Sequence, residues 1–581
     1  MEFTVWAPRA ERVDLVLDDG PLSMARHPDD WFTVDADAPH GSRYGYSLDS
    51  GPARPDPRGP WLPEGVHAPG RVYDHSEFVW TDATWRGRPW FEAVLYELHV
   101  GTFTPEGTFD AAAGHLPHLV ALGVTHVELM PVCAFDGVAG WGYDGVAAWS
   151  VHEPYGGPDG LKRFVDSAHG MGLAVILDVV HNHLGPSGNY LNEFAPFSTD
   201  RVRTPWGDAV NLDGQGSDGV RDYFVDSVRA WLRDFHADGV RLDAVHELHD
   251  TRALTFLEEL GDAVRQLSSE LSRPLVTVAE SDRNDPRTVQ PSDVGGIAMT
   301  AQWDDDVHHA LHAWLTGENQ AYYADFALDP AASLDSVFSG GFFHAGTYSS
   351  FRGRVHGRPL AGTGVTGTDL VASLQTHDQI GNRAHGERLS QLVPHSRLAA
   401  GAALLLLGPF VPMLFMGEEW AASTPWLFFS AFPDPALAAA VTEGRQAEFA
   451  EHGWARSGVP DPQDPATVRR SVLDWSEPAR PPHSAMLTWY RQLIALRHTH
   501  PDLRDPELRE GTLTVDGPLA VMRRGSFTVV ASLAEREMSV AVPAATEVVA
   551  GYDSAGGPVR VRNADGDHRV DLPPGAVGVV R

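Results

Sequence analysis

An arginine and an aspartate stand two residues apart in the apolar stretch 239–246, whose sequence is Gly-Val-Arg-Leu-Asp-Ala-Val-His. If this stretch is a strand, its side chains alternate between two faces, so Arg241 and Asp243 point the same way. Charges on an otherwise buried strand are costly unless they are paired at a solvated mouth, and a fixed Arg keeps a neighbouring Asp ionised. An ionised, oriented carboxylate can act as a nucleophile. The alternative is a structural Arg–Asp pair that closes the end of a barrel.

Three other apolar stretches end in residues of the same kind. They end Asp178-Val179-Val180-His181-Asn182-His183, Val278-Ala279-Glu280-Ser281-Asp282 and Gln375-Thr376-His377-Asp378-Gln379. Asp178 alone would favour a structural hydrogen-bonding role. Carboxylates at four strand ends, which meet at one end of an α/β barrel, predict a catalytic site instead.

The elements that must position these side chains follow a regular pattern from Ala93 onward. Near-continuous apolar strands alternate with amphipathic helices, which is typical of a (β/α)8 barrel with its chemistry at the carboxyl ends of the strands. We predict strands at 94–98, 126–130, 174–180, 240–244, 275–279, 297–302, 371–374 and 412–415. We predict helices that include 112–122, 160–171, 220–235, 254–270 and 485–497.

Short apolar runs separated by turn residues flank this pattern on both sides. They predict an N-terminal β-sandwich over residues 1–85 and a second small β domain over residues 506–581, which leaves 86–505 for the catalytic barrel. The predicted fold class is therefore α/β, a TIM barrel with N-terminal and C-terminal β-sandwich domains.

The composition limits the partners of the protein. A formal net charge of −34 over 581 residues argues against nucleic acid or an anionic membrane as partner and favours a neutral substrate. The one cysteine, Cys133, excludes an intramolecular disulfide and a Cys-rich zinc site. The N-terminus lacks a signal-peptide pattern and no segment approaches a membrane span, so we expect a cytoplasmic protein. Lys162 is the only lysine, and the sequence leaves the oligomeric state open.

The four motifs around Asp178, Asp243, Glu280 and Asp378 resemble the short signature regions of the α-amylase family of glycoside hydrolases, in the same order and on the same strands. The resemblance covers nearly the whole chain. It implies hydrolysis with retention, which needs two carboxyl groups roughly 5–5.5 Å apart. Asp243 is then the nucleophile, Glu280 is the acid and later the base, and Asp378 is the third carboxylate, which binds sugar hydroxyls and favours the distorted transition state.

The resemblance also implies substrate-binding positions. Arg241 keeps Asp243 ionised, while His183 and His377 hydrogen-bond sugar hydroxyls in the reacting subsite. Tyr143 stacks on the sugar there, because sugar rings present apolar faces to aromatic side chains. The remaining predicted substrate-binding residues are His246, which contacts the leaving-group sugar, Trp303, Asp304 and Gln379.

Some of these assignments compete with ordinary structural roles. Tyr155 and Trp206 are further aromatic candidates, but a Trp or His without such a motif often belongs to the core. Many family members bind calcium partly through the residue that matches Asn182. No acidic oxygen-rich loop accompanies Asn182 in this sequence, so we predict no metal and no cofactor.

Three stretches, 302–309, 374–383 and 411–419, most resemble the family members that release trehalose from maltooligosyltrehalose. A branching enzyme would more usually have Glu in place of Gln379. We therefore expect cleavage of the α-1,4 bond next to a terminal trehalose, with maltooligosyltrehalose or a related α-glucan as substrate. Selection of trehalose over maltose depends on loops around residues such as Asp282 and Glu419, which the sequence does not place.

The alternatives are a glucan branching enzyme, an α-amylase, or, from another class, an inactive glycan-binding barrel protein. An ordinary α-amylase would not need the N-terminal sandwich. An inactive protein would be expected to have lost one of the three carboxylates, and all three are present.

Overall fold

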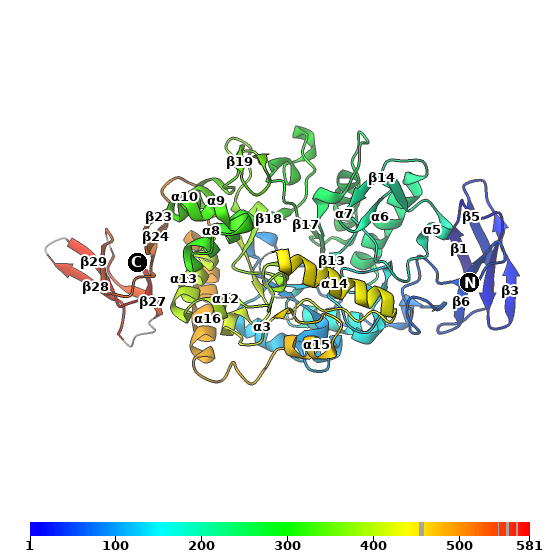
Figure 1. The fold of residues 1–581 in the computed structure, drawn as a ribbon, viewed down its shortest axis with the longest axis horizontal. Helices are drawn as coiled ribbons and strands as arrows, with labels where there is room; N and C mark the ends of the chain where they lie inside the picture. The colour runs from blue at the N-terminus through cyan, green and yellow to red at the C-terminus, as the bar shows by residue number, and fades with distance from the viewer. Residues whose placement is uncertain (452–457, 544, 553–556, 565–566) are drawn as a thin grey trace.

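The structure, a computed structural model, describes residues 1–451, 458–543, 545–552, 557–564 and 567–581. Figure 1 shows a central barrel with strands of the N-terminal part on one side and C-terminal sheets on the other. Eight parallel strands close the barrel: β9 (Leu95–Leu98), β10 (His126–Leu129), β13 (Ala174–Val179), β16 (Gly239–Leu242), β17 (Val276–Ala279), β18 (Ala301–Trp303), β21 (Leu370–Ser373) and β22 (Val411–Phe415). These are the eight predicted strands, so the predicted (β/α)8 barrel is confirmed.

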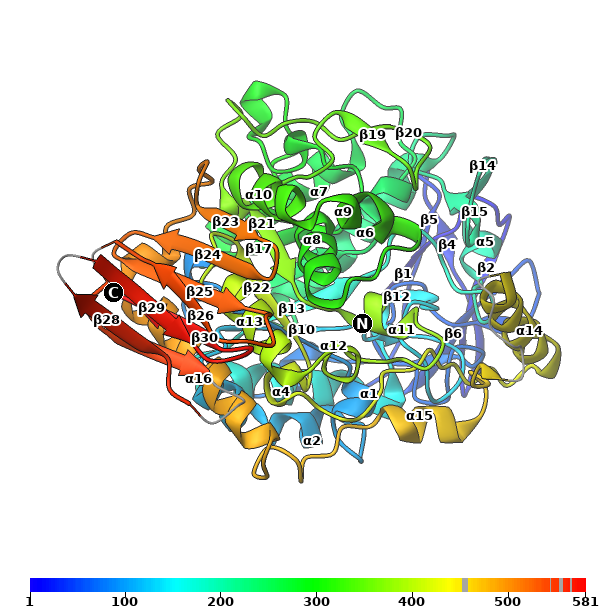
Figure 2. The same cartoon turned by 60° about the vertical axis from the view of Figure 1, so that its left-hand side comes forward.

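Helices surround the barrel (Figures 1 and 2). The larger ones are α4 (Gly157–Gly170), α6 (Ser217–Arg233), α7 (Phe256–Leu271), α8 (Asp305–Thr316), α10 (Pro330–Gly340), α13 (His395–Leu406), α14 (Pro435–Glu451) and α16 (His483–Thr499). Shorter ones are α1 (Val100–Phe103), α2 (Phe109–Ala113), α3 (Leu116–Leu122), α5 (Leu191–Phe194), α9 (Ala324–Leu328), α11 (His377–Gly381), α12 (Leu389–Leu392) and α15 (Pro465–Ser471). None of the helices in the described ranges is long and apolar enough to cross a membrane.

Two predicted elements differ from the observed ones for local reasons. The helix predicted at 112–122 is divided into α2 and α3, because Gly114 ends the first and Pro117, which lacks an N–H donor, stands in the first turn of the second. The strand predicted at 297–302 begins only at Ala301. Ahead of it, Ala298 has a left-handed φ of 60° and the Ile297 N–H bonds the Arg287 carbonyl, so this run is a loop.

Three small hairpins extend from the loops around the barrel. They are β11 (Cys133–Ala134) with β12 (Ala147–Val151), β14 (Ser198–Thr204) with β15 (Gly207–Val210), and β19 (Thr347–Ser349) with β20 (Arg354–His356).

The N-terminal residues form two packed sheets. The strands are β1 (Glu2–Trp6), β2 (Val13–Leu17), β3 (Gly20–Ser23), β4 (Ala25–Arg26), β5 (Trp31–Asp35), β6 (Arg43–Leu48), β7 (Ala53–Arg54) and β8 (Gly70–Arg71). Strands β1, β5 and β4 make one sheet, and β3, β2, β6 and β7 with β8 make the other. Alternate residues such as Phe3 and Val5 of β1 are buried, as a half-buried strand requires. This confirms the N-terminal sandwich.

The C-terminal residues also form two sheets. The strands are β23 (Leu513–Asp516), β24 (Leu519–Arg524), β25 (Phe527–Ser532), β26 (Met538–Ala541), β27 (Val548–Tyr552), β28 (Arg560–Ala564), β29 (Asp567–Leu572) and β30 (Val577–Val580). Val530 and Val570, from different sheets, share one apolar core, and the larger sheet contacts α13 and α16 (Figure 2). A C-terminal sheet domain is thus present, while the limits 85/86 and 505/506 stay predictions.

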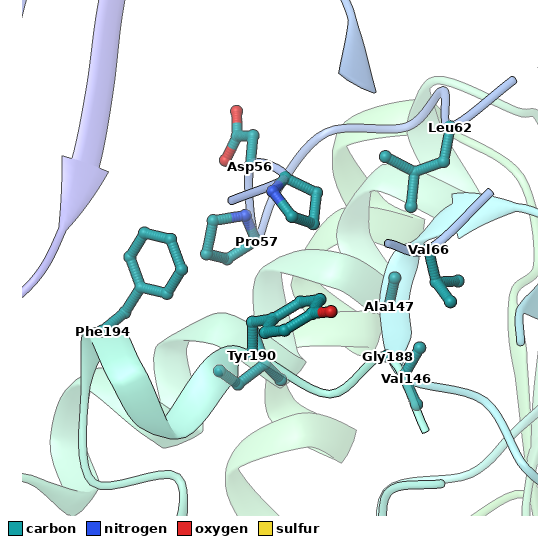
Figure 3. Close-up of a pocket in the computed structure, with 11 residues that line it drawn as sticks. Asp56, Pro57, Leu62, Val66, Val146, Ala147, Gly188, Tyr190 and Phe194 are labelled. Carbon is teal, nitrogen blue, oxygen red and sulfur yellow. The ribbon is translucent and has the colours of Figure 1, made fainter. Parts of the chain in front are cut away.

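A small hollow lies where the N-terminal residues meet the barrel. Figure 3 shows it between the segment 55–66 and the residues Gly188 to Phe194, with mostly apolar side chains around it. The carboxyl among its lining residues, Asp56, accepts hydrogen bonds from the Tyr44 hydroxyl at 2.8 Å and the Arg58 N–H at 2.9 Å. The hollow is therefore part of the packing between the two regions and is not a candidate active site.

Residues 73–85, here called the strap, lead from the N-terminal sheets to the base of the barrel. The Lys162 side chain of α4 is buried beneath the strap, and its Nζ donates to the His75 carbonyl at 3.3 Å. Four aromatic rings surround this ammonium with centroids 5.0–5.9 Å from Nζ, namely Tyr73, Phe78, Trp80 and Phe235. Burial lowers the pKa of Lys162 to about 8, against the opposing effect of Asp159, Asp234 and Asp74.

The strap ends in a buried ionic cluster, here called the base network, which consists of Asp82, Trp85, His169, His236, Asp238 and Arg273. His169 Nδ1 lies 2.8 Å from Asp82 Oδ2, and its Nε2 lies 2.9 Å from Asp238 Oδ2. Trp85 Nε1 donates to the other Asp238 oxygen at 2.8 Å. Burial lowers the pKa of His169, but the two carboxylates outweigh it, so the net shift of the pKa is upward and the charged form of the ring is favoured.

Candidate active site

The Arg241 guanidinium is the centre of the candidate site. It is fully buried, and Nη1 donates to Asp178 Oδ2 at 2.8 Å and to Asp243 Oδ1 at 2.9 Å. Its Nη2 lies 2.9 Å from Glu280 Oε2. The predicted Arg241–Asp243 pair is therefore formed. Because one rigid guanidinium contacts both groups, the carboxyls of Asp243 and Glu280 lie side by side.

The ends of the strands place these carboxyls at the mouth of the barrel. Strand β16 ends at Leu242 and β17 at Ala279, so Asp243 and Glu280 are each the first residue beyond a strand. The Glu280 N–H still donates to the Leu242 carbonyl, which holds the backbone in the sheet register. Asp378 lies in the first turn of α11, which follows β21. The barrel thus brings three carboxyls from distant parts of the chain to one end.

The surroundings of Asp243 favour its ionised form. Asn182 Nδ2 donates to Asp243 Oδ2 at 2.8 Å, and Arg241 holds the other oxygen. Burial raises the pKa of Asp243, but Arg241 and the Asn182 hydrogen bond outweigh it, so the net pKa is below its ordinary value. The side chain remains 11 % exposed, so the carboxylate is charged and still reachable.

The surroundings of Glu280 have the opposite effect. Burial raises its pKa, the carboxylates of Asp243 and Asp378 add to the rise, and Arg241 opposes it without reversing it. The net pKa is well above the ordinary value, so the surroundings favour the protonated form of Glu280. Two adjacent carboxyls whose pKa values are moved apart are the pattern of a nucleophile beside a general acid.

Ala244 directs a hydrogen bond to Glu280 from a strained backbone. Its φ of 40° and ψ of 52° are left-handed, which costs a residue with a Cβ about 1–3 kcal/mol. In this conformation the Ala244 N–H donates to Glu280 Oε2 at 2.6 Å. The strained backbone of Ala244 thus helps to hold the Glu280 carboxyl in place.

Asp378 is the most exposed of the three carboxyls, with 41 % of its side chain accessible. His377 Nε2 lies 3.6 Å from Asp378 Oδ1, and on the other side of the ring Nδ1 lies 2.5 Å from Glu97 Oε1. Burial lowers the pKa of His377, but Glu97 and Asp378 outweigh it and raise the pKa to about 9. The ring is therefore an imidazolium at neutral pH.

Aromatic and imidazole rings line the same side of the mouth. The Tyr143 hydroxyl donates to Asp178 Oδ2 at 2.7 Å, and its ring stacks on His377 with centroids 5.1 Å apart. His183 is held by the Tyr143 carbonyl at 3.0 Å and stacks on Trp206 with centroids 4.5 Å apart. Trp206, at the turn of the β14–β15 hairpin, is 49 % exposed, so its outer face is available for a sugar ring.

Two predicted substrate-binding residues lie beneath the mouth. Trp303 is 4 % exposed, and the Arg241 guanidinium covers its ring at 4.3 Å from the centroid. Asp304 is 2 % exposed, and burial raises its pKa well above the ordinary value. Strand β18 extends to Trp303, one residue beyond its predicted end, which leaves both side chains in the interior. Their placement does not support direct contact with substrate.

Two further candidates are core residues. Tyr155 is 3 % exposed, and its hydroxyl lies 3.0 Å from His99 Nε2. Glu419 is fully buried, where its Oε1 lies 2.8 Å from His118 Nε2. Both side chains are buried, so the structure does not support Tyr155 as a platform and places Glu419 in the core.

Gln379 and His246 occupy the rim. Gln379 Oε1 accepts from both the N–H and the hydroxyl of Thr376 at 2.7 Å, which completes a capping box at the start of α11. His246 is half-buried, and its Nδ1 accepts a long hydrogen bond of 3.4 Å from the Asp282 N–H. Asp282 is in turn paired with Arg352 of the β19–β20 hairpin at 2.9 Å.

Two carboxyls of the site were not among the predicted residues. Glu97 interrupts the apolar strand β9, as Arg241 interrupts β16, so the same rule of a charge within a buried strand identifies it. Asp305, half-buried at the start of α8, lies within the stretch 302–309 but was not singled out there among three consecutive aspartates. Burial, as the largest cause, and the nearby carboxylate of Asp378 raise the pKa of Asp305 to about 7.

Within the described part of the chain, no group of three or more His, Cys, Asp or Glu residues could hold a metal ion. Asn182, the position matched to calcium ligands, donates to Asp243.

Comparisons with known proteins fit this geometry. A family model described as the catalytic domain of alpha amylase matches residues 75–203. The chain is 54 % identical to a malto-oligosyltrehalose trehalohydrolase of Arthrobacter ramosus over 86 % of this chain and 87 % of that protein. It is 49 % identical to a malto-oligosyltrehalose trehalohydrolase of Rhizobium sp. (strain M-11), over 100 % of this chain and 97 % of that protein. Among solved structures, a putative alpha amylase from Salmonella typhimurium matches with a TM-score of 0.88 and 37 % identity, over 100 % of this chain and 97 % of that one.

Proposed function

The chain belongs to the malto-oligosyltrehalose trehalohydrolases of the α-amylase family, and on this basis we propose that it hydrolyses the α-1,4 bond next to the terminal trehalose of maltooligosyltrehalose. The products are trehalose and a shortened maltooligosaccharide. The observation that carries the mechanism is the contact of one guanidinium, Arg241, with two carboxyls whose pKa values shift in opposite directions.

In the first step the Asp243 carboxylate attacks the anomeric carbon of the last glucose before the trehalose. The bond from that carbon to the glycosidic oxygen breaks, and Glu280 gives its proton to this oxygen, so trehalose leaves as an alcohol. The shortened chain is then an ester of Asp243. This step needs a charged Asp243 and a protonated Glu280. The low pKa of Asp243 and the high pKa of Glu280 favour these two states.

In the second step Glu280, now a carboxylate, takes a proton from water as the water oxygen attacks the same carbon. The ester bond breaks, Asp243 regains its charge and Glu280 is again protonated, so the net reaction consumes one water. Two inversions at one carbon give retention. The adjacency of the two carboxyls on Arg241 supports the short spacing of retaining enzymes.

The remaining mouth residues suit a neutral sugar. His377 and Asp378 present a donor and an acceptor 3.6 Å apart, which matches the hydroxyls of one ring. Tyr143 and Trp206 supply aromatic faces on the same side. We propose that His183 and His246 complete the contacts, whereas Arg241, Trp303 and Asp304 support the mouth from below.

A product analysis tests the proposal against its alternatives. The protein is incubated with maltooligosyltrehalose and, separately, with the plain maltooligosaccharide of equal length, with Asp243→Asn as the inactive control. We expect free trehalose from the first, released much faster than maltose from the second. Comparable cleavage of both would mean an α-amylase, branched products would mean a transferase, and binding without products would mean an inactive glycan-binding protein.

A further inference from the structure

We propose that Glu97, on the first barrel strand, is a positioning residue of the reaction that acts through His377, by keeping its ring charged and aimed at Asp378 and the substrate. The proposal rests on the mechanism described above. Both carboxyl oxygens of Glu97 are engaged by His377, so its effect on the reaction is exerted through that residue.

One carboxylate of Glu97 holds His377 at two points. Oε1 lies 2.5 Å from the ring Nδ1, and Oε2 accepts from the His377 N–H at 3.2 Å. Strand β9 and the start of α11 are 280 residues apart in the chain, so this contact ties the first strand of the barrel to the turn that carries Asp378. The ring and its backbone are fixed together, and the ring cannot move independently of the helix.

The other sides of the His377 ring are closed by aromatic groups. Tyr143 stacks at 5.1 Å between centroids with an interplanar angle of 22°, Trp141 meets the ring edge-on at 5.7 Å, and Trp303 lies at 6.2 Å. Because Nδ1 is engaged by Glu97, the proton on Nε2 is the one directed at the mouth, where Asp378 Oδ1 is 3.6 Å away.

The charge of the ring depends on Glu97. Burial by itself lowers the pKa of His377, and Glu97 is the largest effect that opposes burial. Without this carboxylate, a buried imidazole flanked by Arg241 becomes neutral at lower pH, and Nε2 is no longer a committed donor. Loss of Glu97 should therefore act as a pH-dependent loss of the charge on the His377 ring.

The neighbouring strand supplies a matched control. Glu128 of β10 is the register partner of Glu97 and is also 1 % exposed. Neither of its carboxyl oxygens has a hydrogen-bond partner among the described residues, and burial raises its pKa well above the ordinary value. The surroundings of Glu128 therefore favour its protonated form, and Glu128→Gln breaks no described hydrogen bond. The two substitutions are the same change at the same height in the barrel.

The experiment measures kcat and KM of the wild type, E97Q and E128Q on maltooligosyltrehalose from pH 4.5 to 9. We expect E97Q to lose roughly 10- to 100-fold in kcat/KM near pH 8, as for other groups that orient a histidine from behind. We expect the loss to become smaller toward pH 4.5, because more of the ring binds a proton as the pH falls, so the alkaline limb of the profile moves to lower pH. E128Q keeps the wild-type profile.

A double-mutant cycle separates action through His377 from general damage. In the H377Q background, E97Q should cost nothing further, because the group it positions is gone. A loss of equal size at every pH, or the same loss in the H377Q background, would overturn the proposal, as would a wild-type profile for E97Q. If E97Q does not fold, the same pH profile is measured for E97D, whose shorter side chain keeps a carboxylate but moves it away from His377 Nδ1. A wild type that releases no trehalose contradicts the proposed function alone, since the cycle runs on whichever glucan it cleaves.

Discussion

The barrel holds a buried ionic cluster at each end, and the two differ in how fully their polar atoms are paired. In the base network, His169 is bonded on both sides, and both oxygens of Asp238 accept hydrogen bonds. At the mouth, Asp178, Asp243 and Glu280 share one guanidinium. Asp178 Oδ1 has no partner in the part of the chain that the structure describes.

Exposure separates the two clusters as well. The side chains of Asp82 and Asp238 are each 4 % exposed, whereas those of Glu280 and Asp378 are 16 % and 41 % exposed. Shifted pKa values occur at both ends, so such shifts alone do not locate a catalytic site. Access to solvent does distinguish the two ends, because a reacting group must be open to the substrate.

The sharpest test of this contrast is Asp243→Asn. We expect turnover to fall by roughly four to six orders of magnitude, since the nucleophile is lost, with little change in the free energy of unfolding. Steady-state kinetics and thermal unfolding measure the two quantities. Near-wild-type turnover would remove Asp243 from the mechanism.

Glu280→Gln should have the next largest effect. We expect a loss of roughly 10²- to 10⁴-fold with maltooligosyltrehalose, because a general acid supplies about that much. A glucosyl substrate with an acidic leaving group, such as a fluoride, needs no protonation and should lose less in its first step. An equal loss with both substrates would contradict the role of Glu280 as the acid.

In the base network, His169→Ala should lower the stability of the protein and leave its activity unchanged. It leaves two buried carboxylates without their shared partner, which costs about 3–5 kcal/mol of stability while kcat and KM stay unchanged. Denaturant unfolding and kinetics at a temperature where the variant is folded check both parts. A change in kcat would show that the base network is coupled to the mouth.

The difference in stability between the wild type and His169→Ala should also change with pH in a definite direction. The native pKa of His169 is raised, so its stabilising effect is complete below the unfolded pKa of about 6.5 and is lost as the pH rises through the native value. The native pKa of Asp82 is lowered, so its effect is present above about pH 3.9 and is lost as the pH falls. The wild type should therefore exceed His169→Ala in stability by more at pH 5.5 than at pH 9.5.

Trp206→Ala should have the smallest effect. One aromatic face in contact with a sugar ring contributes about 0.5–1.5 kcal/mol, so we expect kcat/KM to fall by roughly three- to tenfold, mainly through KM. The exposed hairpin turn should keep its stability within about 0.5 kcal/mol. An unchanged KM for maltooligosyltrehalose would show that the exposed ring does not contact substrate.

The sequence was sufficient for the barrel and for the residues that follow its strands directly. The strand pattern is local, and a carboxyl one residue beyond a strand has little freedom, as Asp243 and Glu280 show. Trp303 and Asp304 lie deeper than the sequence indicates, because β18 continues to Trp303, one residue beyond its predicted end. The sequence could not place Glu419, because its partner, His118, is 301 residues away in the chain and no local pattern indicates that contact.

The buried lysine beneath the strap also determines how the chain reacts with acylating reagents. Lys162 is the only side-chain amine in the sequence, and its side chain is covered by four aromatic rings. An amine-reactive ester therefore has no exposed lysine to modify while the strap is closed. Acylation of Lys162, followed by mass spectrometry, would report the rate at which the strap opens, without any label introduced by mutation.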